Sequence, residues 1–183
     1  MNIKNSWPKI IISWLTCLVV RLIPLRAPNL EPILATQMPL TKKYGAIAGF
    51  VYGFLSIVLF DLIVGKTGIW TLITGVAYGL VGLGAWWFFK NRASKVINYV
   101  GYSVIATILY DAATGLSIGP LFFHQSFMQS LTGQIPFTAM HLVGNIALAI
   151  IISPLLYRWV VVNENLETKA LWQRVFPKNK TVS

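Results

Sequence analysis

The sequence has few charged side chains, and acidic ones are the scarcest. Only five of its 183 residues are Asp or Glu, and all charged residues together make up 11% of the chain. Charged residues make up about a quarter of soluble domains, so this composition excludes an ordinary soluble protein. Hydrophobic residues make up 56% of the chain, and the mean hydropathy is +0.67. We therefore expect an all-α membrane protein.

Cysteine is nearly absent and histidine is rare, which limits the possible chemistry. The single cysteine, Cys17, lies in an apolar run, which excludes a disulfide framework and indicates a small core residue. The two histidines are expected on separate elements, where they make no metal site. The chain has no phosphate-binding GxxxxGKS or GxxxxGKT motif. We predict neither a cofactor nor an enzymatic activity.

The net charge of +10 would suit a protein that binds nucleic acid. The basic residues, however, occur in short clusters between apolar stretches rather than along one continuous patch. In a membrane protein such clusters set the orientation of the helices. The sequence therefore predicts no nucleic-acid partner and a lipid bilayer instead.

The apolar stretches predict a bundle of six transmembrane helices. Five are long, at residues 7–25, 44–64, 69–89, 96–114 and 135–162. Residues 30–41 would extend only about 18 Å as a helix, against a hydrocarbon core of about 30 Å. We expect them to form a short or broken second helix, which is tolerated where backbone lines protein or a cavity.

Two Gly-containing pairs, Gly119-Pro120 and Thr132-Gly133, predict breaks in the chain. Residues 121–131 between them are too few to span and too aromatic for a solvated loop, so we expect a short interfacial segment before the last helix. No A-x-A-like cleavage site follows the amino-terminal apolar stretch, which predicts an uncleaved first helix. Residues 1–162 would form a single transmembrane helical domain, and residues 163–183 a basic cytoplasmic tail.

The distribution of Lys and Arg predicts how these helices are oriented. With six crossings and both termini inside the cytoplasmic membrane, twelve of the fifteen basic residues fall on the inner side. Only Arg21, Arg26 and Lys66 fall outside. Such a bias follows the positive-inside rule, and it requires the short second segment to cross the membrane.

Under this topology the polar residues gather toward the outer side. Arg21, Glu31, Asp61 and Asp111 lie at the outer ends of their helices, and Asn145 lies one turn after His141 in the outer half of the last helix. Ionisable groups inside a membrane are costly and often functional. We therefore predict that these six residues line an outward-facing pocket, with Trp70 and other aromatic residues, Tyr110, Phe122, Phe123 and Phe127, as a wall for a flat heterocycle.

Each of these residues also has a structural alternative. Glu31 could be only a favourable charge at a helix start. Asp61 and Asp111 could cap the following loops or form structural ion pairs, and His141 with Asn145 could be a hydrogen-bonded structural pair. The aromatic residues could form an outer membrane belt and nothing more.

Three glycines recur every four residues at the start of the third helix: Gly45, Gly49 and Gly53. Small residues at this spacing let helix backbones approach closely. Packing within the bundle is one interpretation, and a docking face for another membrane subunit is the other.

Four segments resemble the substrate-binding S components of energy-coupling factor (ECF) transporters. They are R-L-I-P-x-x-A-P-N-x-E-P-I from Arg21, S-I-V-L-F-D-L-I-V-G-K-T-G from Ser56, Y-G-L-V-G-L-G-A from Tyr78 and I-P-F-T-A-M-H-L-V-G-N-I from Ile135. The resemblance covers most of the chain, from about Arg21 to Trp159. It implies a six-helix subunit that captures a vitamin or similar micronutrient from outside, beneath a loop at residues 24–31.

The same resemblance implies partners, namely a membrane T subunit and two cytoplasmic ATPases that drive release. Members of the family often carry an Ala-x-x-x-Ala patch on the first helix for docking, whereas Ser13 and Cys17 occupy that spacing here. Docking through the Gly45 face would replace it. The ligand is expected to be small and polar or zwitterionic, because acidic, basic and aromatic residues share the predicted pocket.

Two other protein classes are compatible with parts of the sequence. A structural scaffold resembling the cell-shape protein MreD would also have six helices, including a Gly-rich one that ends in Asp and Gly. An intramembrane aspartyl protease would account for Leu109-Tyr110-Asp111. Its second aspartate should lie in G-x-G-D, and the sequence before Asp61 is Leu-Phe instead.

Overall fold

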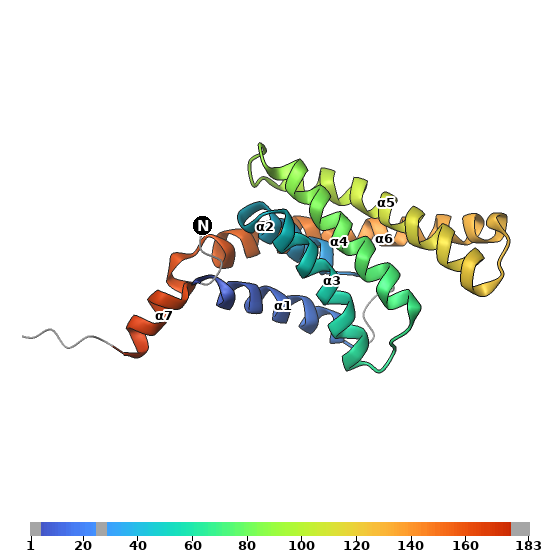
Figure 1. The fold of residues 1–183 in the computed structure, drawn as a ribbon. Helices are drawn as coiled ribbons and strands as arrows, with labels where there is room; N and C mark the ends of the chain where they lie inside the picture. Colours follow the sequence, from blue (N-terminus) through green and yellow to red (C-terminus); the bar gives the residue numbers. More distant parts are fainter. Residues whose placement is uncertain (1–4, 25–28, 177–183) are drawn as a thin grey trace, which may run out of the picture.

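The computed structural model describes residues 5–24 and 29–176, which are almost entirely helical and contain no β-strand (Figure 1). The elements are α1 (Trp7–Leu22), α2 (Ile33–Tyr44), α3 (Ala46–Ile63), α4 (Ile69–Phe89), α5 (Val96–Phe123), α6 (Phe127–Leu156), the π-helical turn η2 (Tyr157–Val161), the 3₁₀ turn η3 (Glu164–Leu166) and α7 (Thr168–Val175). The expected all-α class is confirmed for these residues. The predicted bounds of the fourth helix, 69–89, match α4.

Among the described residues, four helical segments have the length and composition needed to cross a membrane. They are α3, α4, α5 and the continuous helix formed by α6 and η2. α1 has 16 residues and α2 has 12, so both are shorter. The four long apolar helices indicate a membrane protein.

The predicted interfacial segment at residues 121–131 is wrong as a separate element. α5 continues through Gly119 and Pro120 to Phe123, and α6 already begins at Phe127 and runs through Gly133. Where no water competes for backbone groups, a helix tolerates Gly and Pro in its interior. The predicted ends at residues 114 and 135 are therefore both displaced, and α5 and α6 form one long hairpin.

The turn of this hairpin stabilises the end of α5 and the start of α6, which allows both helices to extend to it. His124 ends α5 with a left-handed backbone (φ 52°), and Ser126 begins α6 as a capping box with Gln129. The Ser126 hydroxyl accepts from the Gln129 amide at 3.2 Å, and the Gln129 side chain accepts from the Ser126 amide at 2.8 Å. These bonds satisfy the helix start. Gly119 lets the helices approach, because a Cβ there would lie 2.6 Å from the Ser130 hydroxyl.

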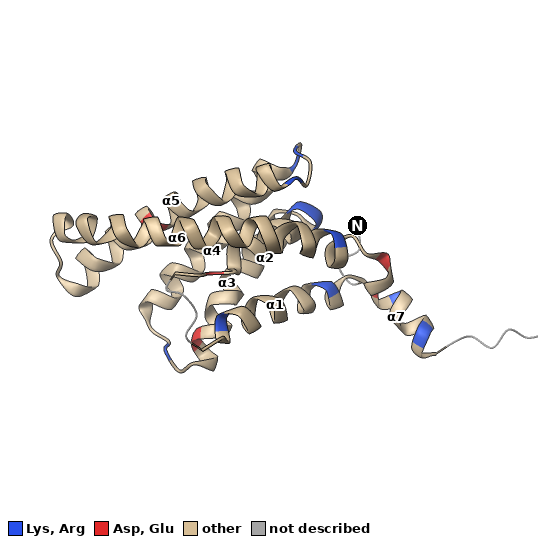
Figure 2. Ribbon diagram, turned by 180° about the vertical axis from the view of Figure 1, so that it is seen from behind, with Lys and Arg blue, Asp and Glu red and all other residues tan. Residues whose placement is uncertain are grey.

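Basic side chains connect the helix ends at one end of the bundle. Lys42 at the end of α2 donates to the carbonyl oxygens of Phe89 (3.3 Å) and Arg92 (2.5 Å), between α4 and α5. Lys9 at the start of α1 donates to the carbonyl oxygen of Val161 in η2 (3.3 Å). We call this the basic end; it carries Lys9, Lys42, Lys43, Lys90, Arg92, Lys95 and Arg158 (Figure 2). Four basic residues that were counted in predicting the orientation lie outside the described residues: Lys4, Arg26, Lys178 and Lys180.

Glycines bring α2, α3 and α4 into close contact. A Cβ on Gly49 would lie 2.3 Å from the Thr41 hydroxyl, and one on Gly53 would lie 2.5 Å from the carbonyl oxygen of Tyr78. The Gln37 amide of α2 donates to the carbonyl oxygens of Gly49 and Tyr78, both at 2.8 Å. Gly49 and Gly53 therefore face the interior, as the packing interpretation predicts. Gly45 (φ 96°) makes the turn between α2 and α3 and has no atom within 4 Å of an added Cβ.

Candidate functional site

A cavity of about 300 Å³ lies among the helix ends opposite the basic end. Its walls come from the ends of α1 and α3, the start of α4, the segment before α2, and the middle of α5 and α6. Five of the predicted ligand-binding residues line it: Arg21, Glu31, Asp61, Trp70 and His141. The other lining residues are Asn29, Ile57, Lys66, Thr74, Tyr78, Tyr110 and Phe137.

Arg21 organises one wall of the cavity. Its Nε lies 3.1 Å from Glu31 Oε2, and its Nη1 donates to the carbonyl oxygen of Ser56 at 3.0 Å. The guanidinium also stacks on Phe60, with 3.7 Å between its carbon and the ring centroid. Because the Arg21 side chain is only 6% exposed, its charge needs these partners. The contacts connect the end of α1 to α3 and to the segment before α2.

Asp61 and Trp70 form the rim where α3 turns into α4. Asp61 Oδ2 accepts a 2.6 Å hydrogen bond from the Thr71 hydroxyl, which itself accepts from the Gly68 amide at 3.1 Å. This arrangement matches the structural alternative that Asp61 caps the turn, although its side chain also lines the cavity. The Trp70 indole donates to the carbonyl oxygen of Lys66 at 3.2 Å, which keeps the ring beside the opening.

His141 and Asp111 form a buried pair at the deep end of the cavity. His141 Nδ1 lies 2.8 Å from Asp111 Oδ1, and the two side chains are 3% and 1% exposed. A carboxylate can only accept, so Nδ1 carries the hydrogen. The other ring nitrogen, Nε2, is buried and has no hydrogen-bond partner among the described residues. Asp111 itself does not line the cavity but supports the histidine that does.

Asn145 lies one turn further along α6 and belongs to a separate, closed space. Its Nδ2 donates to the Thr107 hydroxyl of α5 at 2.7 Å. The space beside it, shared with His141, has no room for a water molecule. Asn145 therefore joins α5 to α6 behind the cavity, and its side chain is not part of the cavity wall.

Aromatic rings surround the histidine. Tyr78 and Tyr110 are in contact, with 4.2 Å between their centroids, and the rings of Tyr110 and Phe137 meet His141 edge-on at 6.1 and 5.7 Å. Of the five aromatic residues predicted as a wall, Trp70 and Tyr110 line the cavity. The other three, Phe122, Phe123 and Phe127, are exposed around the turn of the α5–α6 hairpin.

Sequence reasoning did not identify Tyr78, Phe137 or Asn29 as lining residues. The signal for two of them was helical spacing. Tyr78 lies eight residues after Trp70 on the same face of α4, and Phe137 lies four residues before His141 on the same face of α6. Asn29 has a left-handed backbone (φ 61°) and no helical periodicity to follow. Of the predicted entry loop at residues 24–31, residues 25–28 lie outside the described residues.

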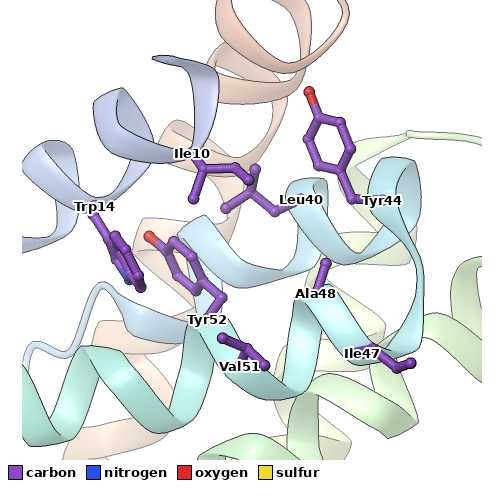
Figure 3. A pocket seen from close by; sticks show the side chains of 8 residues that line it. All are labelled: Ile10, Trp14, Leu40, Tyr44, Ile47, Ala48, Val51 and Tyr52. Atoms are coloured by element: carbon purple, nitrogen blue, oxygen red, sulfur yellow. The ribbon is translucent and has the colours of Figure 1, made fainter. Parts of the chain in front are cut away.

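A second cavity, of about 240 Å³, lies at the basic end between α1, α2 and α3 (Figure 3). Ile10, Trp14, Leu40 and other apolar side chains form most of its surface. Its two tyrosine hydroxyls already have partners, since Tyr52 donates to Ser13 at 3.0 Å and Tyr44 to Val161 at 3.4 Å. With no charged side chain in its lining, this cavity offers little to a polar ligand.

Within the described part of the chain, no group of three or more His, Cys, Asp or Glu side chains is arranged to hold a metal ion. Comparison of the chain with protein-family models, curated proteins and solved structures finds no match.

Proposed function

We propose that this protein binds a small polar solute in the cavity around His141, as the S subunit of an ECF-type uptake transporter would. The observation that supports this proposal is the unpaired Nε2 of His141, buried at the wall of a cavity. Leaving a buried polar atom without a hydrogen bond costs about 1–3 kcal/mol. A ligand that hydrogen-bonds to Nε2 would remove that cost.

The side chains around His141 hold its ring in one orientation, which suits a residue that orients a ligand. Asp111 holds Nδ1, and the rings of Tyr110 and Phe137 flank the imidazole. These contacts fix the orientation of the imidazole ring and the nitrogen that carries its hydrogen. The volume of about 300 Å³ lies at the small end of the range for ligand pockets, which suits a single small molecule.

The charges and rings of the lining favour a polar or zwitterionic heterocycle. Arg21 and Lys66 are cationic, whereas Glu31 and Asp61 are anionic, so both signs of charge lie around one cavity. Tyr78, Tyr110 and Phe137 add flat apolar surface for a planar ring. An aliphatic ligand would form no hydrogen bond or ion pair with these charged groups.

The proposed topology places this cavity on the outer side of the cytoplasmic membrane. It has six crossings, including the short α2, with both termini inside. The concentration of Lys and Arg at the opposite end supports this orientation (Figure 2). A membrane T subunit and cytoplasmic ATPases would then supply the energy for release, because the chain lacks a phosphate-binding motif of its own.

The two histidines allow a matched test of this proposal. The purified protein is analysed by native mass spectrometry for a co-purified small molecule, together with His141→Asn and His124→Asn. His124 lies at the α5–α6 turn with a left-handed backbone that Asn also adopts, so His124→Asn is expected to retain the molecule. His141→Asn is expected to bind the molecule at least about tenfold more weakly, the equivalent of about 1.4 kcal/mol, and therefore to show a lower occupancy.

The same experiment separates transport from the scaffold alternative. A scaffold resembling MreD would carry no bound small molecule, so neither the parent protein nor either variant would show a ligand-bound species. Absence of any bound molecule from protein purified in mild detergent, or equal occupancy in both variants, would contradict the proposed function. Melting temperatures of the variants show whether either result reflects loss of folded protein.

A further inference from the structure

The last helix, α7, has an apolar face that no other described residue covers. Trp172 and Val175 are 65% and 68% exposed, and Phe176, the residue after the helix, is 56% exposed. The rings of Trp172 and Phe176 lie 4.5 Å apart and form one surface. Leu171, partly exposed, extends it along the helix. An exposed apolar face of this kind marks an interaction site rather than a solvated helix.

The opposite face of α7 is polar and basic. Lys169 and Gln173 are four residues apart and share one side, and Arg174 lies next to them. Arg174 donates to the side chain of Asn165 at 2.9 Å, so its position is linked to the preceding turn η3. No acidic residue lies within α7. Aromatic residues on one face and Lys and Arg on the other are typical of helices that lie in a membrane interface.

The start of α7 is held beside the ends of the membrane-crossing segments. Glu167 forms an ion pair with the buried Lys9 of α1 at 3.3 Å, and the Thr168 hydroxyl donates to the carbonyl oxygen of Asn5 at 3.2 Å. Lys9 in turn donates to Val161, where the helix formed by α6 and η2 ends. From this point α7 diverges from the other helices (Figure 1). Its first residue therefore lies close to where that helix leaves the membrane.

We propose that the apolar face of α7 lies in the headgroup region of the same bilayer that the long helices cross, held there by anionic phospholipid. Two observations support this partner. Trp7 at the start of α1 and Trp159 in η2 are also exposed at the basic end, by 52% and 61%, as expected for tryptophans at a membrane interface. The charge of α7 and of the basic end is complementary to an anionic leaflet. This inference does not depend on the ligand cavity.

A helix in this position has a specific expected depth. Trp172 and Val175 reach about 5–10 Å into the boundary between headgroups and acyl chains, whereas Lys169 and Gln173 remain in water. The eight residues of α7 are about 12 Å long, so the helix covers a few headgroups and does not cross the bilayer. Attraction to anionic lipid falls with added salt, because the exposed charges are screened within about 10 Å at 0.1 M.

Spin labelling of the full-length protein tests this placement. Cys17 is the only cysteine and is buried, so a Cys17→Ser background allows single labels at Trp172→Cys or, as the matched control, Gln173→Cys. The proteins are reconstituted in vesicles of phosphatidylcholine alone or mixed with phosphatidylglycerol. Accessibility of each label to oxygen, which enters bilayers, and to a water-soluble nickel chelate then reports its depth.

The proposal expects the label at 172 to be accessible to oxygen and protected from nickel, and the label at 173 to show the reverse. Protection at 172 should increase with phosphatidylglycerol and decrease on Lys169→Glu. Because labelling removes Trp172 itself, Val175→Cys provides a second reporter that leaves the indole in place. Equal nickel accessibility at 172, 173 and 175 in mixed vesicles would overturn the proposal and leave the face of α7 open to a soluble protein partner. Protection that is independent of phosphatidylglycerol would overturn the role of anionic lipid.

Discussion

Replacing Gly82 by alanine is expected to destabilise the protein, because α3 and α4 leave no room for a methyl group between them. A Cβ at residue 82 would lie 2.4 Å from both the carbonyl carbon and the carbonyl oxygen of Gly49. Ordinary contacts begin at 3.4 Å, so the two backbones must separate by about 1 Å. The same Cβ would lie 2.5 Å from the amide nitrogen of Gln37, whose two hydrogen bonds join α2 to α3 and α4.

Gly101 provides a matched control for this substitution. It also lies inside a helix, α5, but no atom lies within 4 Å of a Cβ added there. Both substitutions gain about 0.8–1.0 kcal/mol of helix propensity, so their difference isolates the steric cost. Inserting a methyl group into a packed interior costs about 1–3 kcal/mol. A chain of this size loses about 2–4 °C of melting temperature per kcal/mol, which predicts a difference of about 2–12 °C.

The assay is thermal unfolding of detergent-purified protein, followed by tryptophan fluorescence. Gly82→Ala should melt below the parent protein or close to it, and Gly101→Ala at or above it. Equal melting temperatures for the two variants would refute the close contact of α3 with α4. If Gly82→Ala kept full stability but lost solute uptake, the glycine surface would instead be acting in subunit docking.

Further predictions concern the buried pair and the orientation in the membrane. Asp111→Leu leaves His141 Nδ1 buried without an acceptor and should cost about 1–3 kcal/mol more than Asp111→Asn, which keeps an acceptor oxygen; thermal unfolding measures this, and equal losses would argue against the pair. In a Cys17→Ser background, Lys66→Cys should react with a membrane-impermeant maleimide added to intact cells, whereas Lys90→Cys should react only after lysis. The reverse pattern would place the ligand cavity on the inner side of the membrane.

The hydropathy of the sequence was the main signal from which the positions of the helices could be predicted. The 69–89 helix was predicted at its observed bounds because Gly68 and Lys90 flank an uninterrupted apolar run. The end of α5 was missed because Gly119 and Pro120 are strong breakers in water. They did not break the helix here, since the paired helices of the hairpin supply close contacts and a capped turn at His124 and Ser126.

Five of the seven predicted binding residues line the candidate cavity, and the contacts among them were not predicted. Charge in an apolar segment is visible in any sequence, and this indicated Arg21, Glu31, Asp61 and His141, all of which line one cavity. Nothing in the spacing indicated that His141 would pair with Asp111 on another helix, 30 residues away, or that Asn145 would lie behind the cavity.

The sequence alone therefore determined the all-helical class, how apolar each segment is and at which end most basic residues lie, because these properties depend on composition over short stretches. Only the tertiary structure decided the pairing of His141 with Asp111 and the inward position of Gly49. The rotation and separation of neighbouring helices determine which side chains meet. These quantities are set by interdigitation of side chains across the whole bundle, and no single segment encodes them.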